Sequence, residues 1–249
     1  VQSYMLRTMD EFIHHPFMVN MYDTIQLQYK DFSEYEKELH IVIKNFQNYF
    51  PKTPPTQLVT FTAGIGPRNF YDTPYLGIGL DLYLGEDYPY YPSQGLPDFL
   101  IKRFLPKYIA TDAAISLATG EIIDPLKRGT QFLDIMVYYG KIYYIASYLS
   151  PKSPIEDFYN YSKEDWEWCE TNEKEIWAFF IDGEWLSKNQ LMDYRKFIDD
   201  APTTMGMPQG APDRVGKWMG YQIVKKFMKE NPDMSFQELI NIESGQEVL

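Results

Sequence analysis

Tyr75–Gly85 reads YLGIGLDLYLG, and this stretch decides the fold class. Isoleucine and leucine alternate with glycine, aspartate and tyrosine, which is the pattern of a half-buried β-strand. Asp81 lies in the middle of the run, opposite its apolar face. Leu58–Thr62 has the β-branched and aromatic content of a second strand, and the glycines and prolines that follow it predict a loop.

Helices are predicted on both sides of this pair of strands. Apolar spacing and capping residues indicate helices over 31–50, 97–117, 131–149, 162–181, 213–229 and 235–242. The 131–149 segment is apolar almost all round, which predicts a buried helix. Strands segregated from helices predict an α+β fold, predominantly helical, in which a small mixed sheet packs on helices. No long linker interrupts the chain, so we expect a single domain over residues 1–249.

Composition and charge exclude several classes of function. The chain has 249 residues, of which 45% are hydrophobic and 23% charged, and this excludes intrinsic disorder. A net charge of −12 repels phosphate backbones, so no nucleic-acid partner is expected. One cysteine and three histidines, two of them adjacent, do not form a zinc-binding motif, and no cofactor is expected.

Carboxylates and tyrosines are the remaining candidates for chemistry. Glu173 lies on the apolar stripe of the 162–181 helix, where a carboxylate needs a partner, and Arg195 and Arg214 are candidates. Cys169 lies on the same stripe, which indicates a buried, unreactive thiol. The tyrosines of the Pro-rich 88–97 segment either stack on a sugar or peptide or fasten this predicted loop to the body.

Five segments together resemble one known family. In chain order they are Tyr75–Asp87, Met136–Lys141, Asn172–Glu173, Ile176–Trp177 and Arg214–Val224. This ordered set is similar to the gliding-motility lipoprotein GldB family of the Bacteroidota, and the similarity extends over roughly residues 1–249. The resemblance implies a periplasm-facing cell-envelope lipoprotein with a lipid anchor upstream of this segment. It also implies partners among the envelope proteins of gliding or secretion machinery.

The GldB family is in turn distantly similar to zincin-type predicted zinc-dependent proteases. In those proteins a strand like 75–85 precedes a helix with the motif His-Glu-x-x-His. Ile109–Ile115 falls at that place, with Thr111 and Ile115 where the histidines would stand and Asp112 where the glutamate would stand. Tyr139 falls at the third ligand. Threonine, isoleucine and tyrosine do not make an ordinary zinc site, so the resemblance implies a zincin-like scaffold with no metal and no catalytic residues.

A groove left by the lost site remains a candidate binding surface. Its candidate lining residues are Asp112, Tyr138, Tyr139, Lys141, Asp81 and Glu173. We expect a non-enzymatic protein that binds envelope proteins, for example by adding an extended peptide to an edge strand. Two alternatives stay open. The residues only pack the core, or the chain is a metal-free hydrolase that acts on peptide or glycan through two carboxylates roughly 5–10 Å apart.

Overall fold

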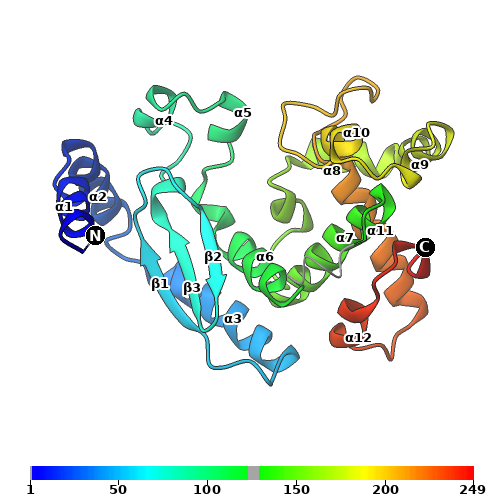
Figure 1. Cartoon of the computed structure of the whole chain (residues 1–249), viewed down its shortest axis with the longest axis horizontal. Coiled ribbons are helices and arrows are strands. Elements are labelled where there is room, and N and C mark those ends of the chain that lie inside the picture. The colour runs from blue at the N-terminus through cyan, green and yellow to red at the C-terminus, as the bar shows by residue number, and fades with distance from the viewer. Residues whose placement is uncertain (1, 123–128) are drawn as a thin grey trace.

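Helices dominate residues 2–122 and 129–249, which are the residues that the computed structural model describes (Figure 1). The α-helices are α1 (Gln2–Ile13), α2 (Pro16–Gln28), α3 (Ser33–Tyr49), α4 (Tyr90–Ser93), α5 (Asp98–Ile101), α6 (Ile109–Ile122), α7 (Phe132–Leu149), α8 (Lys163–Thr171), α9 (Glu173–Asp182), α10 (Leu191–Tyr194), α11 (Val215–Glu230) and α12 (Phe236–Asn241). The predicted α+β class with helices in the majority is confirmed.

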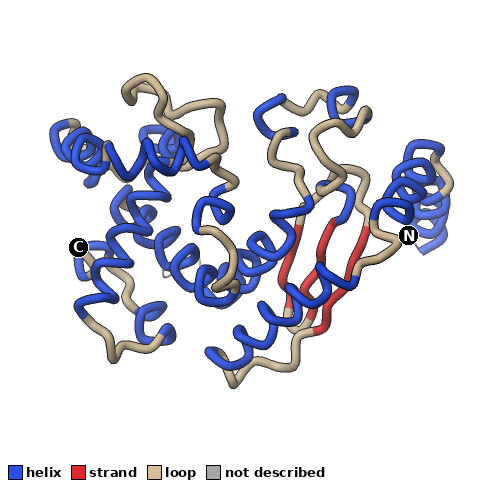
Figure 2. The backbone as a smooth tube through the Cα atoms, turned by 180° about the vertical axis from the view of Figure 1, so that it is seen from behind, coloured by secondary structure: helices blue, strands red, loops and turns tan. Residues whose placement is uncertain are grey.

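Three short strands form a mixed sheet in the order β1-β3-β2. The strands are β1 (Gln57–Phe61), β2 (Asn69–Asp72) and β3 (Tyr75–Gly79). The central strand β3 runs parallel to β1 and antiparallel to β2. Helix α6 lies beside β2, and α3 crosses one face of the sheet, where Phe46 contacts Tyr71 at a ring-centroid distance of 5.5 Å (Figure 2). The sheet is therefore packed on helices, as predicted.

The predicted strand Tyr75–Gly85 is half wrong, because the extended backbone ends at Gly79. Residues 80–82 instead form a 3₁₀ turn, and all side chains from Leu80 to Leu84 are buried, so the apparent alternation does not separate two faces. The turn aims the Asp81 carboxylate at the preceding loop, where it accepts hydrogen bonds from the backbone N–H groups of Ile65 at 2.7 Å and Ala63 at 3.3 Å. The loop expected after the first strand contains β2.

Two predicted helices are interrupted. The 162–181 segment begins with a capping box of Ser162 and Asp165 but divides at Asn172, whose side-chain amide donates to the Trp168 carbonyl. The 97–117 segment becomes α5, a 3₁₀ turn that starts at Pro106, and α6. The predicted 88–97 loop contains the short helix α4 and is fastened to the body, because Tyr91 is fully buried and donates to the Asp81 carbonyl. The fastening interpretation of its tyrosines is thus the one that the structure supports.

Close packing of α7 against α11 organises the C-terminal half. These two helices share the largest contact between any two elements in the described ranges, and Trp218 is fully buried there. A Cβ at Gly140 would lie 2.1 Å from the Gly220 carbonyl oxygen, and a Cβ at Gly220 would lie 1.8 Å from the Met136 carbonyl oxygen. The two glycines therefore let the helix backbones approach more closely than any side chain would allow.

Helices α1 and α2 precede the first helix that the sequence pattern predicts. They lie together at one end of the molecule, next to the β1 edge of the sheet (Figures 1 and 2). His15 caps α2, because its ring nitrogen accepts a hydrogen bond from the Phe17 N–H. Helix α2 buries Met18, Met21 and Ile25. Helix α1 buries none of its residues from Leu6 to Ile13, so it adds exposed surface rather than core.

Candidate functional site

Charged side chains from both halves of the chain meet in one group, which we call the junction cluster. Its members are Arg68, Arg103, Asp112, Asp200, Asp213 and Arg214. Arg68 directly precedes β2, and Asp112 lies in the first turn of α6. Asp200 and Asp213 stand on either side of the Pro/Gly-rich 201–212 loop. The cluster therefore joins the sheet, α6 and the start of α11.

Asp112 is held at one end of the cluster by two donors. Arg68 Nη1 lies 2.8 Å from Asp112 Oδ2, and the Tyr83 hydroxyl donates to the same oxygen at 2.9 Å. Arg68 also donates to the Asn160 side-chain oxygen at 3.2 Å and to the Arg103 carbonyl at 2.9 Å. The side chains of Arg68 and Asp112 are only 22% and 12% exposed. This carboxylate is thus fixed as the partner of an arginine.

Asp213 and Asp200 occupy the other end. Arg103 donates to Asp213 Oδ1 and to Asp200 Oδ1, both at 2.9 Å. Arg214 Nε donates to Asp213 Oδ2 at 3.1 Å, and the Ala201 N–H donates to that oxygen at 3.0 Å. Burial acts to raise the pKa of the Asp200 carboxyl, but the positive charges of Arg214, Lys217 and Arg103 outweigh it and hold the pKa below its ordinary value.

Lys217 adds a fourth cation beside the cluster. Its ammonium nitrogen lies 4.4 Å from the ring centroid of Tyr139, in a cation–π arrangement. Burial and the nearby charge of Arg214 lower the pKa of Lys217 to about 8. Three carboxylates thus face three arginines and one partly buried lysine, so the junction carries an excess of positive charge in a chain of net charge −12.

Helix α7 turns only some of its predicted site residues toward the junction. The Tyr139 ring contacts Lys217 and packs against the Tyr138 ring at a centroid-to-centroid distance of 5.3 Å. Tyr143, one turn later, is close enough to Arg214, Asp200 and Asp112 to be affected by their charges. Lys141 lies about 200° around the helix from Tyr139 and is buried on the opposite side, where it donates to the Ile242 carbonyl. Lys141 is therefore not a groove residue, which corrects the prediction.

Two further predicted site residues lie outside the junction. Asp81 is fully buried against its own loop, and burial raises its pKa despite the hydrogen bonds from Ile65 and Ala63. Glu173 was expected to be buried beside Arg195 or Arg214 and is instead exposed. The break at Asn172 changes the phase of the helix, so Glu173 becomes the first residue of α9 and faces solvent. Of the predicted site residues, Asp112 is a member of the junction cluster, and Tyr138 and Tyr139 are in ring contact beside Lys217.

The residue types that metals prefer do not gather in the described ranges. No group of three or more His, Cys, Asp or Glu side chains within residues 2–122 and 129–249 has a geometry that fits a metal ion. His14, His15 and His40 are exposed. Cys169 is buried, and burial raises the pKa of its thiol. At the positions aligned with a zinc motif, Thr111 is buried and its hydroxyl donates to the Tyr108 carbonyl.

Exposed apolar side chains concentrate on α1 and α2, a feature that the sequence analysis missed. We call this surface the N-terminal apolar face, and its members are Leu6, Met9, Phe12, Ile13, Val19, Tyr22 and Leu27. They are seven of the eighteen exposed large hydrophobic residues in the described part of the chain. An apolar pocket of about 550 Å³ lies between these helices and the end of β1, lined in part by Phe12, Tyr22 and Phe61. The i, i+3, i+7 spacing of Leu6, Met9 and Ile13 was the available signal.

The fold and the site define a mainly helical α+β protein with arginine-paired carboxylates and an exposed N-terminal apolar face. A family model described as gliding motility protein GldB matches residues 2–249, and the chain belongs to that family. The family is one of lipoproteins, which indicates a place in the cell envelope and a role in gliding motility. Neither a curated protein nor a solved structure was found to match. Among the described helices, none is sufficiently long and apolar to cross a membrane.

Proposed function

We propose that this chain is a non-enzymatic, periplasm-facing lipoprotein that supports gliding or secretion machinery by binding other envelope proteins. Membership of the GldB family supports the place and the process. The relationship to zincin-type proteases and the single-domain organisation stay predictions. The site that supports binding best is not the groove expected from the sequence but the N-terminal apolar face.

The N-terminal apolar face carries this proposal. Leu6, Met9 and Ile13 are 64%, 58% and 56% exposed, although their spacing places them on one side of α1. A surface helix normally turns such a stripe toward the core, and contiguous exposed apolar surface is typical of interaction sites. The helix carries Asp10 and Glu11 as well as Arg7, so it lacks the basic face of a helix that lies on an anionic membrane. A protein surface fits it better.

The junction cluster favours a structural role over hydrolysis. A metal-free hydrolase needs two carboxyl groups facing one cleft, with the pKa of at least one raised to serve as the acid. Asp112 and Asp213 are each fixed by arginine, and the pKa of Asp200 is lowered rather than raised. Asp81 has a raised pKa but faces its own backbone loop. The hydrolase alternative therefore has weaker support than binding.

A complementation experiment tests the proposal. In a gliding bacterium whose family gene has been deleted, the gene is returned with Leu6→Ser, Met9→Ser and Ile13→Ser together. Because these side chains are exposed, the free energy of unfolding should fall by less than about 2 kcal/mol. We expect the variant to be present at the wild-type level in the envelope and to fail to restore spreading.

The matched control carries the same chemical change at exposed apolar residues elsewhere, Leu191→Ser, Met192→Ser and Met205→Ser. This control should restore gliding. Equal gliding of the two triple variants would contradict the role of the N-terminal apolar face.

A second experiment tests the hydrolase alternative. A folded variant with Asp112→Asn and Asp200→Asn should still glide, whereas loss of gliding by this folded double variant would reopen the hydrolase alternative.

A further inference from the structure

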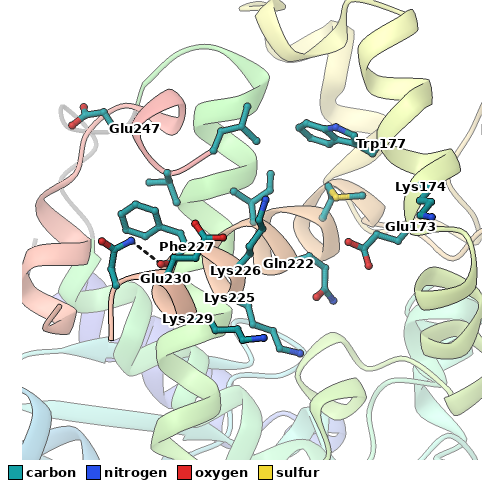
Figure 3. A pocket seen from close by; sticks show the side chains of 15 residues that line it. Glu173, Lys174, Trp177, Gln222, Lys225, Lys226, Phe227, Lys229, Glu230 and Glu247 are labelled. Atoms are coloured by element: carbon teal, nitrogen blue, oxygen red, sulfur yellow. Dashed lines mark hydrogen bonds between the residues drawn. The ribbon is translucent and has the colours of Figure 1, made fainter. Parts of the chain in front are cut away.

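A second surface, at the opposite end of the chain, has a composition unlike the rest of the molecule. A groove of about 930 Å³ runs between α9, α11 and the C-terminal segment (Figure 3). Its floor is apolar and includes Trp177, Ile223 and Phe227. Trp177 and Phe227 are half-buried, so part of each aromatic side chain faces the groove. A groove with this floor would give an occupant substantial apolar contact area.

Four lysines line the same groove. Lys225, Lys226 and Lys229 lie on α11, and Lys174 lies on α9 beside Trp177 (Figure 3). Within the described residues, none of the four has a carboxylate at ion-pair distance, although Lys225 lies near the ring of Tyr221 at 5.7 Å. Their side chains are exposed, so their charges are available to an occupant of the groove.

Acidic residues at the groove are fewer and separated. Glu173 and Glu230 stand near the lysines, whereas Glu247 lies at the far end of the groove (Figure 3). The lining thus holds four lysines and three glutamates, an excess of one positive charge, which is opposite in sign to the net charge of −12 of the whole chain. Such a reversal favours an occupant with negative charges at discrete positions, which can pair with lysines while avoiding the two glutamates.

We propose that this groove binds an acidic amphipathic helix of a partner protein. The apolar stripe of the helix would lie on Trp177, Ile223 and Phe227, and its flanking carboxylates would pair with Lys174 and Lys226. Two packed helices with an apolar trough between them form a surface that accepts a third helix. A flat anionic membrane does not reach a concave floor and would meet Glu173 and Glu230 together with the lysines. This proposal does not rest on the N-terminal apolar face, since the two surfaces share no residue.

Binding of fluorescent 16-residue peptides to the full chain tests the proposal. The first peptide places leucines at i, i+3, i+4 and i+7 with glutamates on both flanks. The second has the same composition in scrambled order, and the third has lysine in place of glutamate. We expect anisotropy to show binding of the first alone, with an affinity that falls as salt rises. Lys174→Glu with Lys226→Glu should weaken it by about tenfold or more, because two attractions become repulsions.

The control variant reverses the same number of charges on exposed lysines away from the groove, Lys52→Glu with Lys163→Glu. It should bind the first peptide as the wild type does. Absence of binding, equal binding of the scrambled peptide, or an equal loss in both double variants would overturn the proposal. So would tight binding to vesicles of anionic phospholipid that depends on Lys174 and Lys226, because the occupant would then be a membrane. Failure of the N-terminal variants to support gliding leaves each of these outcomes unchanged.

Discussion

The effect of Asp112→Ala on the free energy of unfolding distinguishes a structural role of this carboxylate from a catalytic one. The substitution removes the acceptor of two hydrogen bonds, from Arg68 at 2.8 Å and from Tyr83 at 2.9 Å. Hydrogen bonds to a charged group contribute about 1.5–3 kcal/mol each, and breaking a buried ion pair costs about 3–5 kcal/mol. We therefore expect the free energy of unfolding to fall by about 3–5 kcal/mol. A carboxylate kept for catalysis would behave differently, since its removal is commonly neutral or stabilising.

A double-mutant cycle measures the pair itself. Wild type, Arg68→Met, Asp112→Ala and the double variant are unfolded in urea at pH 7, and the midpoint and slope give the free energy of each. Because the two side chains are mostly buried, we expect a coupling energy of about 2 kcal/mol. A coupling below about 0.5 kcal/mol, or an Asp112→Ala variant as stable as the wild type, would refute the assignment of the junction cluster as a structural device.

Three further predictions follow from buried groups. Burial lowers the pKa of Lys141 to about 8 from 10.5, so the unfolded state binds more protons between these values, and stability should rise with pH there by up to about 1.4 kcal/mol per pH unit. Urea midpoints from pH 7.5 to 9.5 should show a smaller rise in Lys141→Met than in the wild type, and an equal rise in both would contradict the burial of Lys141. Lys217, whose pKa is lowered in the same way, adds to the rise that remains. Gly220→Ala should lower the free energy of unfolding by about 3 kcal/mol because its Cβ collides with the Met136 carbonyl, whereas wild-type stability would disprove the close approach. Cys169 should react with a thiol reagent only after unfolding, and rapid reaction in the folded protein would show that it is accessible.

Elements with a strong local pattern were predictable. Helix α7 is apolar all round and was placed within one residue of its observed start, and Ser162 with Asp165 marked the start of α8. The division at Asn172 was not predictable, because the apolar spacing continues across it. The end of β3 at Gly79 was missed for a similar reason, since leucines at alternate positions also fit a buried turn.

The site was harder to predict than the fold because its contacts join distant parts of the chain. Arg68 and Asp112 are 44 residues apart, and Arg103 and Asp213 are 110 apart. Spacing along the chain carries no information about such pairs, so Asp112 was identified only through a resemblance and its arginine partner was missed. Lys141 and Tyr139 were expected in one groove because the resemblance aligned 139–141 with the third-ligand segment of a zincin, but a separation of two residues on a helix turns them to opposite sides of α7.

Photo-crosslinking from α1 tests the central claim, binding through the N-terminal apolar face, most directly. p-Benzoylphenylalanine is placed at position 9 in place of Met9 in living, gliding cells, and at position 192 in place of Met192 as a control that is 73% exposed. After irradiation, position 9 should give a discrete adduct with another envelope protein that position 192 does not give. The absence of an adduct at position 9 in cells that still glide would contradict the account.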